Sequence, residues 1–121
     1  MHRRRGLARQ QWAEFFADVD VLLCPVQPVP PIRHLHDPDG SNWRNSVLAD
    51  HGDRPYLDLA LWTSFIGGSY LPVTVPPAGR TAAGVPIGIQ VVAPYLHDRT
   101  ALAFARAIEP VLGGFTPPPT A

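Results

Sequence analysis

Two histidines near the middle of this 121-residue sequence have a spacing that metal ligands can have. His34 and His36 are two positions apart, so an extended segment would place both side chains on one side. Asp39 or His51 could complete a zinc site with them. However, no helix of the His-Glu-x-x-His type accompanies the pair, and histidines are common in solvated loops. A small metal-binding protein is therefore the weaker alternative, and we expect no metal and no cofactor.

A serine, a histidine and an aspartate could also form a hydrolytic triad, namely Ser69, His97 and Asp98. No Gly-x-Ser-x-Gly turn surrounds the serine, and adjacent histidine and aspartate side chains do not orient each other well. We expect His97 and Asp98 to precede and cap a helix instead. Gly67-Gly68, followed by the serine, is typical of a helix end and a turn.

Composition gives no support to several classes of function. Ten acidic residues balance ten basic residues, all of them arginine, so no overall field favours nucleic acid, a membrane or acidic substrates. Arg3–Arg5 is too short a basic run to indicate nucleic-acid binding, and a solvated N-terminus explains it. Cys24 is the only cysteine and follows an apolar run, so we expect a buried, unreactive thiol and a cytoplasmic location.

Apolar periodicity predicts the elements that must position these side chains. Helices are predicted over 8–18, 55–66 and 98–109, and short strands over 21–24, 71–75 and 87–92. Pro110 is expected to kink or end the last helix. Residues 26–54 lack periodicity and are rich in Pro, His and Asp, which predicts a long loop. This order of elements predicts an α/β fold with a mixed β-sheet covered by helices.

The stretch Leu71–Pro94 organises the rest, because its two strands are apolar on both faces. Arg80, in the loop between the strands, is its only charged residue. Strands of this kind belong inside a sheet that helices cover on each side. We therefore expect residues 1–121 to be a single partial domain of something larger, with an open sheet edge that favours association.

This stretch also carries a resemblance to a known family. LPVTVPPAG, GVPIGIQVVAP, a following helix and a Phe-x-Pro-Pro ending resemble the C-terminal part of the amidase signature family. The segment Asp20–Pro25, DVLLCP, resembles that family's strand of an aspartate, a hydrophobic run and a proline. The resemblance covers nearly the whole chain, from Trp12 to Pro118, and implies the C-terminal portion of the amidase signature fold.

The resemblance implies hydrolysis of carboxylic amides by a serine nucleophile, a second serine in a cis peptide, and a lysine. The sequence contains neither a lysine nor a Ser-Ser pair, and arginine cannot replace the lysine as a base because it stays protonated. We therefore expect no catalytic residue in this chain and no activity from the chain alone. The sequence departs from the family at Gly67, where an asparagine is common, and at Tyr70, where a glycine is common.

The helix predicted over 55–66 is the element most directly connected to function. Ala60, Ser64 and Gly67 recur at i, i+4 and i+7 and form one stripe of small residues that would leave room for a substrate group. The resemblance implies that the corresponding helix of the family lines the acyl pocket. The alternative is that the stripe packs against a neighbouring helix.

Two functions from different classes stay open at this point. In the first, the chain is the C-terminal segment of an amidase-family hydrolase and gives strands and one pocket wall to a missing N-terminal catalytic half. In the second, it is a non-enzymatic piece or subunit that completes the sheet of a partner chain. Neither function involves nucleic acid or a membrane.

Overall fold

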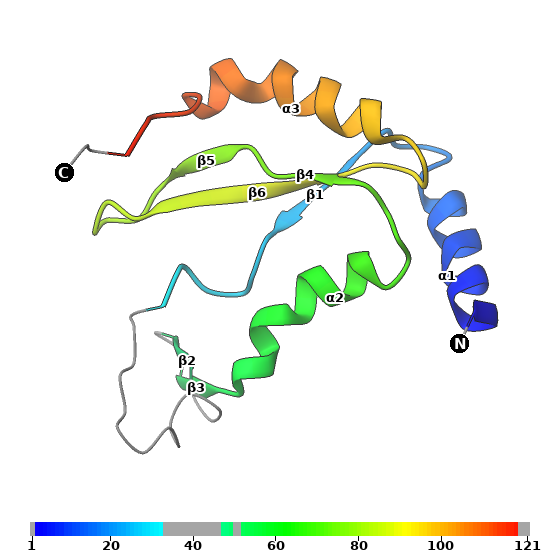
Figure 1. The fold of residues 1–121 in the computed structure, drawn as a ribbon, viewed down its shortest axis with the longest axis horizontal. Helices are drawn as coiled ribbons and strands as arrows, with labels where there is room; N and C mark the ends of the chain where they lie inside the picture. The colour runs from blue at the N-terminus through cyan, green and yellow to red at the C-terminus, as the bar shows by residue number, and fades with distance from the viewer. Residues whose placement is uncertain (1, 33–46, 50–51, 119–121) are drawn as a thin grey trace.

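The computed structural model describes the backbone of residues 2–32, 47–49 and 52–118, and the side chains of residues 3–32 and 55–118. Helices lie on both sides of a four-stranded sheet (Figure 1). The helical elements are α1 (His2–Phe15), the 3-10 helix η2 (Tyr56–Ala60), α2 (Leu61–Gly67) and α3 (Asp98–Leu112). The strands are β1 (Leu22–Pro25), β2 (Val47–Ala49), β3 (Gly52–Arg54), β4 (Val73–Thr74), β5 (Pro77–Arg80) and β6 (Pro86–Val92).

Strand β6 is the centre of the sheet and pairs with β1, β4 and β5. Its partners include Leu22 of β1 and Val73 of β4, both opposite Val92. The α/β class is confirmed, but every strand pair in the described part of the chain is antiparallel, whereas we expected a mixed sheet. The reason is the connection: β4 and β5 lead into β6 through a short turn, and parallel neighbours need a much longer crossover.

Helix α3 covers one face of the sheet. A buried cluster joins the strand and the helix, formed by Val91, Ala93, Ala101 and Ala105. The partly buried side chains of Val21, Phe104 and Ile108 pack against this cluster. Small alanines on the inner side of α3 let the helix lie close to the strand.

Helices α1 and α2 cover the opposite face at one end. The buried cluster on this face consists of Cys24, Ile66, Leu71 and Val92. The partly buried side chains packed against it are those of Trp12, Phe16, Leu22 and Trp62. Val91 and Val92 are both fully buried although they are neighbours, because successive strand residues point to opposite faces. The expectation of apolar strands covered on both sides is confirmed at the C-terminal end of β6, whereas Val73 and Val75 of the first predicted strand are 37% and 50% exposed.

The N-terminal helix is longer than expected. α1 begins at His2 rather than Ala8, so the arginines of its first turn are helical and not a solvated extension. Arg5 explains the difference, because its guanidinium donates hydrogen bonds to the Gly68 carbonyl at 3.1 Å and to the Tyr70 hydroxyl at 2.8 Å. This tertiary anchor holds the first turn in place.

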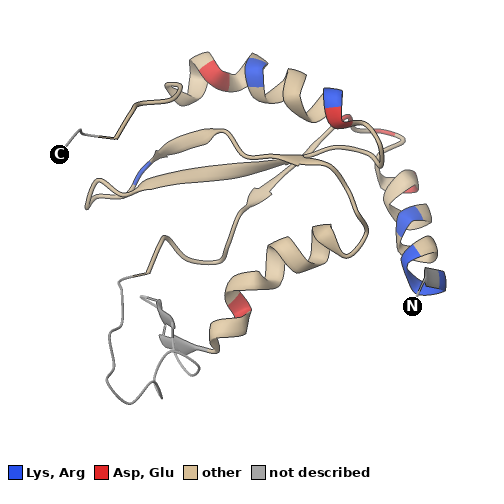
Figure 2. Cartoon of the chain, viewed as in Figure 1, with Lys and Arg blue, Asp and Glu red and all other residues tan. Residues whose placement is uncertain are grey.

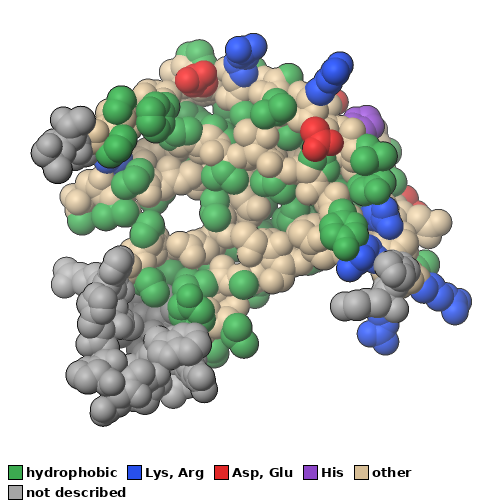
Figure 3. Space-filling view, viewed as in Figure 1, with side chains coloured by type: hydrophobic (Ala, Val, Ile, Leu, Met, Phe, Trp, Pro, Cys, Tyr) green, Lys and Arg blue, Asp and Glu red, His purple; other side chains and the backbone are tan. Residues whose placement is uncertain are grey.

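The helix predicted over 55–66 forms as η2 followed by α2, and much of its surface stays open. Leu57 is 81% exposed and Leu61 is 55% exposed, although a helix that is apolar on most sides is normally buried. The space-filling view shows an opening between the sheet and these two helical elements (Figure 3). Upstream, strands β2 and β3 pair with each other inside the segment 26–54 that we expected to be a loop.

Helix α3 continues through Pro110 to Leu112, although we expected the proline to kink or end it. Pro110 lies in the last turn of α3, so only two residues of the helix follow it and few backbone hydrogen bonds of the helix are affected. The helix ends at Gly113, whose φ of 86° lies in the left-handed region that glycine adopts freely. At the other end, His97 rather than Asp98 is the N-cap residue. None of the described helices is long and apolar enough to cross a membrane.

Candidate functional site

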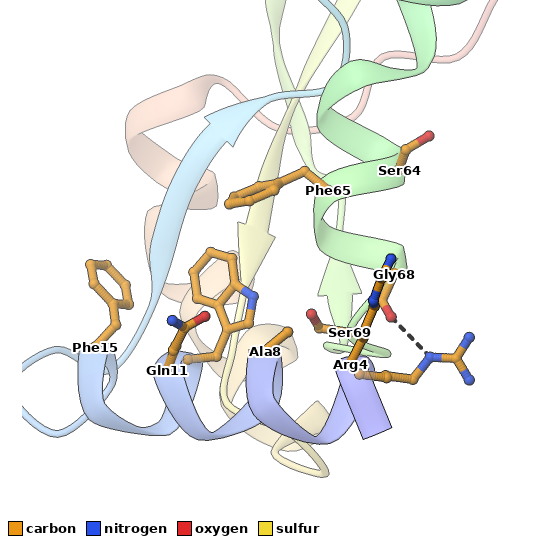
Figure 4. Close-up of a pocket in the computed structure, with 10 residues that line it drawn as sticks. Arg4, Ala8, Gln11, Phe15, Ser64, Phe65, Gly68 and Ser69 are labelled. Carbon is orange, nitrogen blue, oxygen red and sulfur yellow. Dashed lines mark hydrogen bonds between the residues drawn. The ribbon is translucent and has the colours of Figure 1, made fainter. Parts of the chain in front are cut away.

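A cavity of about 640 Å³ opens between α1 and α2, and we call it the α1–α2 cleft. Figure 4 shows it from the side, with α1 below and α2 above. Its lining residues are Arg4, Arg5, Ala8, Gln11, Trp12 and Phe15 from α1, and Ser64, Phe65, Gly68 and Ser69 from α2 and the turn that follows. The volume falls in the range of small-molecule sites.

Aromatic rings form the apolar wall of the α1–α2 cleft. Phe65 extends from α2 toward α1, and its ring centroid lies 5.3 Å from that of Trp12 in an edge-to-face arrangement (Figure 4). Trp12 also contacts Phe15 at 5.7 Å and Phe16 at 5.8 Å. Phe65 and Phe15 nevertheless remain 59% and 45% exposed. The cleft therefore presents unburied aromatic surface.

Arginines form the other end of the cleft. Besides its two hydrogen bonds, Arg5 lies over the ring of Tyr70, with the guanidinium carbon 4.1 Å from the ring centroid. Tyr70 itself has a φ of 57°, a strained value for a tyrosine, so this contact helps to hold the turn after α2. A second pair, Arg9 over Tyr95 at 4.5 Å, fixes α1 to the segment before α3. The two pairs hold α1 against both neighbouring segments.

The predicted stripe of small residues extends from the last residue of η2 along α2, and only part of it reaches the cleft. Ser64 is a lining residue, whereas Ala60 and Gly67 are not among them. All three residues are exposed, and a Cβ added at Gly67 would meet no atom within 4 Å. Whether the stripe lines a substrate pocket or packs against another helix stays a prediction.

The structure does not assemble the triad. Ser69 is buried at 4% exposure in the turn after α2, whereas His97 and Asp98 lie exposed at the start of α3. No hydrogen bond joins the side chains of these three described residues. His34, His36, Asp39 and His51 lie outside the residues whose side chains are described. Among the described residues no group of three or more His, Cys, Asp or Glu side chains could hold a metal ion.

Gln90 and Cys24 have structural roles, and Cys24 is buried as expected. The Gln90 amide donates a hydrogen bond to the Pro25 carbonyl at 2.7 Å and contacts the Cys24 sulfur at 3.7 Å. Burial raises the pKa of the Cys24 thiol above its ordinary value, so the thiol stays protonated and unreactive near neutral pH. Together the two side chains tie β1 to β6.

Sequence reasoning missed the cleft because it treated Arg3–Arg5 as a solvated end. The signal was present in the spacing: Arg5, Ala8 and Trp12 stand at i, i+3 and i+7, so a helix that begins before Ala8 would place all three on one side. Among the described residues, no His, Asp, Glu or Lys lines the cleft, and its buried serine has no base beside it. The cleft can bind and position a group, but these lining residues offer no general base.

The described residues form a sheet covered by helices on both faces, with a cleft between α1 and α2. The family model described as Amidase matches residues 1–102, and the chain belongs to that family.

Similar proteins include an amide hydrolase and subunits of glutamyl-tRNA(Gln) amidotransferases. Fatty-acid amide hydrolase 2-A of Danio rerio is 48% identical over 118 residues, which cover 98% of this chain and 19% of the relative. A glutamyl-tRNA(Gln) amidotransferase subunit from Haloarcula marismortui is 33% identical over 107 residues, covering 86% of this chain and 22% of the relative. The corresponding subunit from Natronomonas pharaonis is 35% identical with the same coverage. The chain spans about a fifth of the length of these curated relatives.

Proposed function

We infer that the chain is the C-terminal segment of an amidase-family hydrolase that cleaves carboxylic amides to an acid and ammonia or an amine. The observation that carries this proposal is the family match over residues 1–102, on a sheet covered by helices on both faces. The order of the motifs DVLLCP, LPVTVP and GVPIGIQVVAP supports the C-terminal position. The relatives' names, a fatty-acid amide hydrolase and amidotransferase subunits, support amide chemistry.

In this proposal the segment contributes no catalytic residue. The sequence has no lysine and no Ser-Ser pair, and no side-chain hydrogen bond joins Ser64 or Ser69 to a base among the described residues. Arginine cannot replace a neutral lysine, because its guanidinium stays protonated at any working pH. The catalytic serine and lysine belong to another segment of the same fold, supplied either in the same polypeptide or by a partner chain.

The segment's direct contribution is one wall of the substrate pocket. Ala60 at the end of η2 and Ser64 and Gly67 on α2 stay exposed, and their small size leaves room for the acyl group of an amide. The Arg5–Tyr70 contact supports this wall, because it fixes the turn at which α2 ends. We place the protein in the cytoplasm and assign it no cofactor.

A reconstitution assay tests the proposal. The chain is assayed on simple aromatic and aliphatic amides, alone and mixed with the Danio rerio relative from which the matching 118-residue segment has been deleted. We expect no turnover from the chain alone and measurable turnover from the mixture, sensitive to a serine-directed inhibitor. Turnover by the chain alone that the same inhibitor abolishes would contradict the proposal.

A non-enzymatic interaction piece is the second candidate. The observation that favours it is apolar surface left open on η2 and α2, where Leu57, Leu61 and Phe65 are exposed. The described strands also leave β1 at an edge of the sheet, and open edges favour pairing with another chain. A chain that binds its partner strongly but changes no turnover would support this second function.

A further inference from the structure

We propose that the α1–α2 cleft is the docking surface for an apolar, acid-flanked segment of the amidase-family polypeptide that carries the catalytic serine and lysine. The proposal rests on the proposed function and specifies where the two parts meet. Three features of the described residues support it: the length of the open apolar stripe, the uncompensated charge beside it, and the lack of acidic side chains among the residues that line the cleft.

The apolar surface is longer than the cleft. Leu57, Leu61 and Phe65 are 81%, 55% and 59% exposed and recur every four residues along η2 and α2. The stripe is roughly 14 Å long, from a rise of about 2 Å per residue in a 3-10 helix and 1.5 Å in an α-helix. At its α2 end it meets the exposed rings of the cleft. Leu61 and Phe65 lie one turn apart on α2, and Leu57 lies one turn earlier on η2. Several large exposed apolar side chains gathered on one helical stretch indicate an interaction site, since exposed apolar residues are normal only when they are scattered singly.

Among the described residues, no acidic side chain in the first turn of α1 or in the cleft lining balances the positive charge of the arginines there. α1 begins with three arginines and has no acidic residue in its first turn (Figure 2). Positive side chains at a helix N-terminus oppose the helix dipole, so this arrangement is unfavourable by itself. Arg5 is engaged by the Gly68 carbonyl and Tyr70, whereas Arg3 and Arg4 are exposed. An acidic group beside Arg3 and Arg4 would compensate both charges and the dipole.

The nature of the occupant follows from these features. It must bury aromatic and aliphatic surface along the stripe and bring carboxylates to the arginine end. A polypeptide segment meets both needs over this length. A second copy of this chain is the rival occupant, but pairing two such clefts face to face would bring arginines together, with no acid among the described lining residues of either copy.

Matched variants test the docking surface in the reconstitution assay. Phe65→Asp changes the cleft, and Leu102→Asp makes the corresponding change on α3, where the leucine is also 59% exposed. Arg4→Glu and Arg106→Glu are the charge pair, because both arginines are exposed on a helix. Circular dichroism of each variant establishes that its helix content is retained.

We expect Phe65→Asp to weaken association with the truncated relative by about tenfold or more, as loss of a central aromatic contact does. Arg4→Glu should weaken it less, and mostly at low salt, because a rim charge acts through screened attraction. Leu102→Asp and Arg106→Glu should leave association within about twofold of the unchanged chain.

The outcomes separate this inference from the proposed function. If the unchanged chain restores turnover and Phe65→Asp behaves like Leu102→Asp, the docking surface is wrong and the proposed function stands. If the unchanged chain neither binds nor restores turnover, both fail. Light scattering measures whether the chain associates with itself. If it does, if Phe65→Asp abolishes this association, and if the chain does not bind the relative, a second copy is the occupant and the inference is overturned.

Discussion

Helix α3 closes its face of the sheet with small side chains, whereas α1 and α2 cover the opposite face only at one end. On the α3 side, Ala101 and Ala105 are buried against Val91 at 1%, 7% and 0% exposure. On the other side, Ile66 and Val92 are equally buried, but the aromatic and aliphatic side chains around them stay open. The α3 face is closely packed around Val91, although a cavity of about 860 Å³ remains between β5, β6 and the C-terminal end of α3.

The two helices differ in their own sequences. In α3 the buried residues are Ala101 and Ala105, whereas Arg99, Arg106 and Glu109 are exposed. The helix therefore has one apolar side and one charged side. The η2–α2 stretch has a single charge, Asp58, and apolar residues on most sides (Figure 2). A helix of that composition is normally buried on all sides. Under the proposed function, α3 is an outer layer of the fold and the exposed side of α2 is covered by another part of it.

The largest effect should come from the buried end of α2. Replacing Ile66, which is 1% exposed, with Ala should lower the free energy of unfolding by about 2–5 kcal/mol, since it leaves a cavity in the cluster. Leu61→Ala in the same helix should change it by less than about 0.5 kcal/mol, because that side chain is already exposed. Urea denaturation followed by circular dichroism measures both. Equal losses would show that α2 is buried along its whole length.

A larger side chain on the buried side of α3 should lower the free energy of unfolding. Ala101→Leu should cost about 1–3 kcal/mol, because no space remains between α3 and Val91. Ala103→Leu, on the exposed side of the same helix, is the control and should be nearly neutral. Thermal melts of the two variants provide the comparison. A neutral Ala101→Leu would mean that α3 is packed as loosely as α2.

A smaller effect is expected where β1 joins the sheet. Gln90→Leu removes the hydrogen bond to the Pro25 carbonyl and should cost about 1 kcal/mol. Gln11→Leu, at an exposed position of α1, serves as the control for the same change. Hydrogen exchange at the amides of β1 should become faster only in the first variant. Unchanged exchange there would contradict a role for Gln90 in holding β1.

The smallest expected effect is the contribution of the Cys24 thiol to the pH dependence of stability. Because burial raises the pKa of Cys24, the unfolded chain loses this proton first as the pH rises past the ordinary value of 9.0. The unfolded state then binds fewer protons than the folded state, so stability falls with rising pH above that value and is unaffected near pH 7. Cys24→Ala should lack this part of the alkaline loss. Urea denaturation of both proteins at pH 7 and pH 10 measures the difference.

Much of the fold was predictable because its signals are local. The alternating apolar residues of β6, the amphipathic pattern of α3 and the glycine that ends it are readable from neighbouring residues alone. The extra turn of α1 was not predicted, because it depends on the contact of Arg5 with Gly68 and Tyr70, more than sixty positions away. The exposure of Leu57 and Leu61 was also missed, since burial depends on which surfaces are present to cover a helix.

The candidate site divides in the same way. The lack of lysine and of a Ser-Ser pair, and the small residues Ala60, Ser64 and Gly67, are properties of the sequence by itself. So is the family resemblance, because motif order needs no coordinates. The α1–α2 cleft was decided only by the tertiary structure, which brings the ring of Trp12 within 5.3 Å of that of Phe65. Contacts between positions so far apart depend on the register of the sheet and the placement of its helices, which no short stretch of sequence specifies.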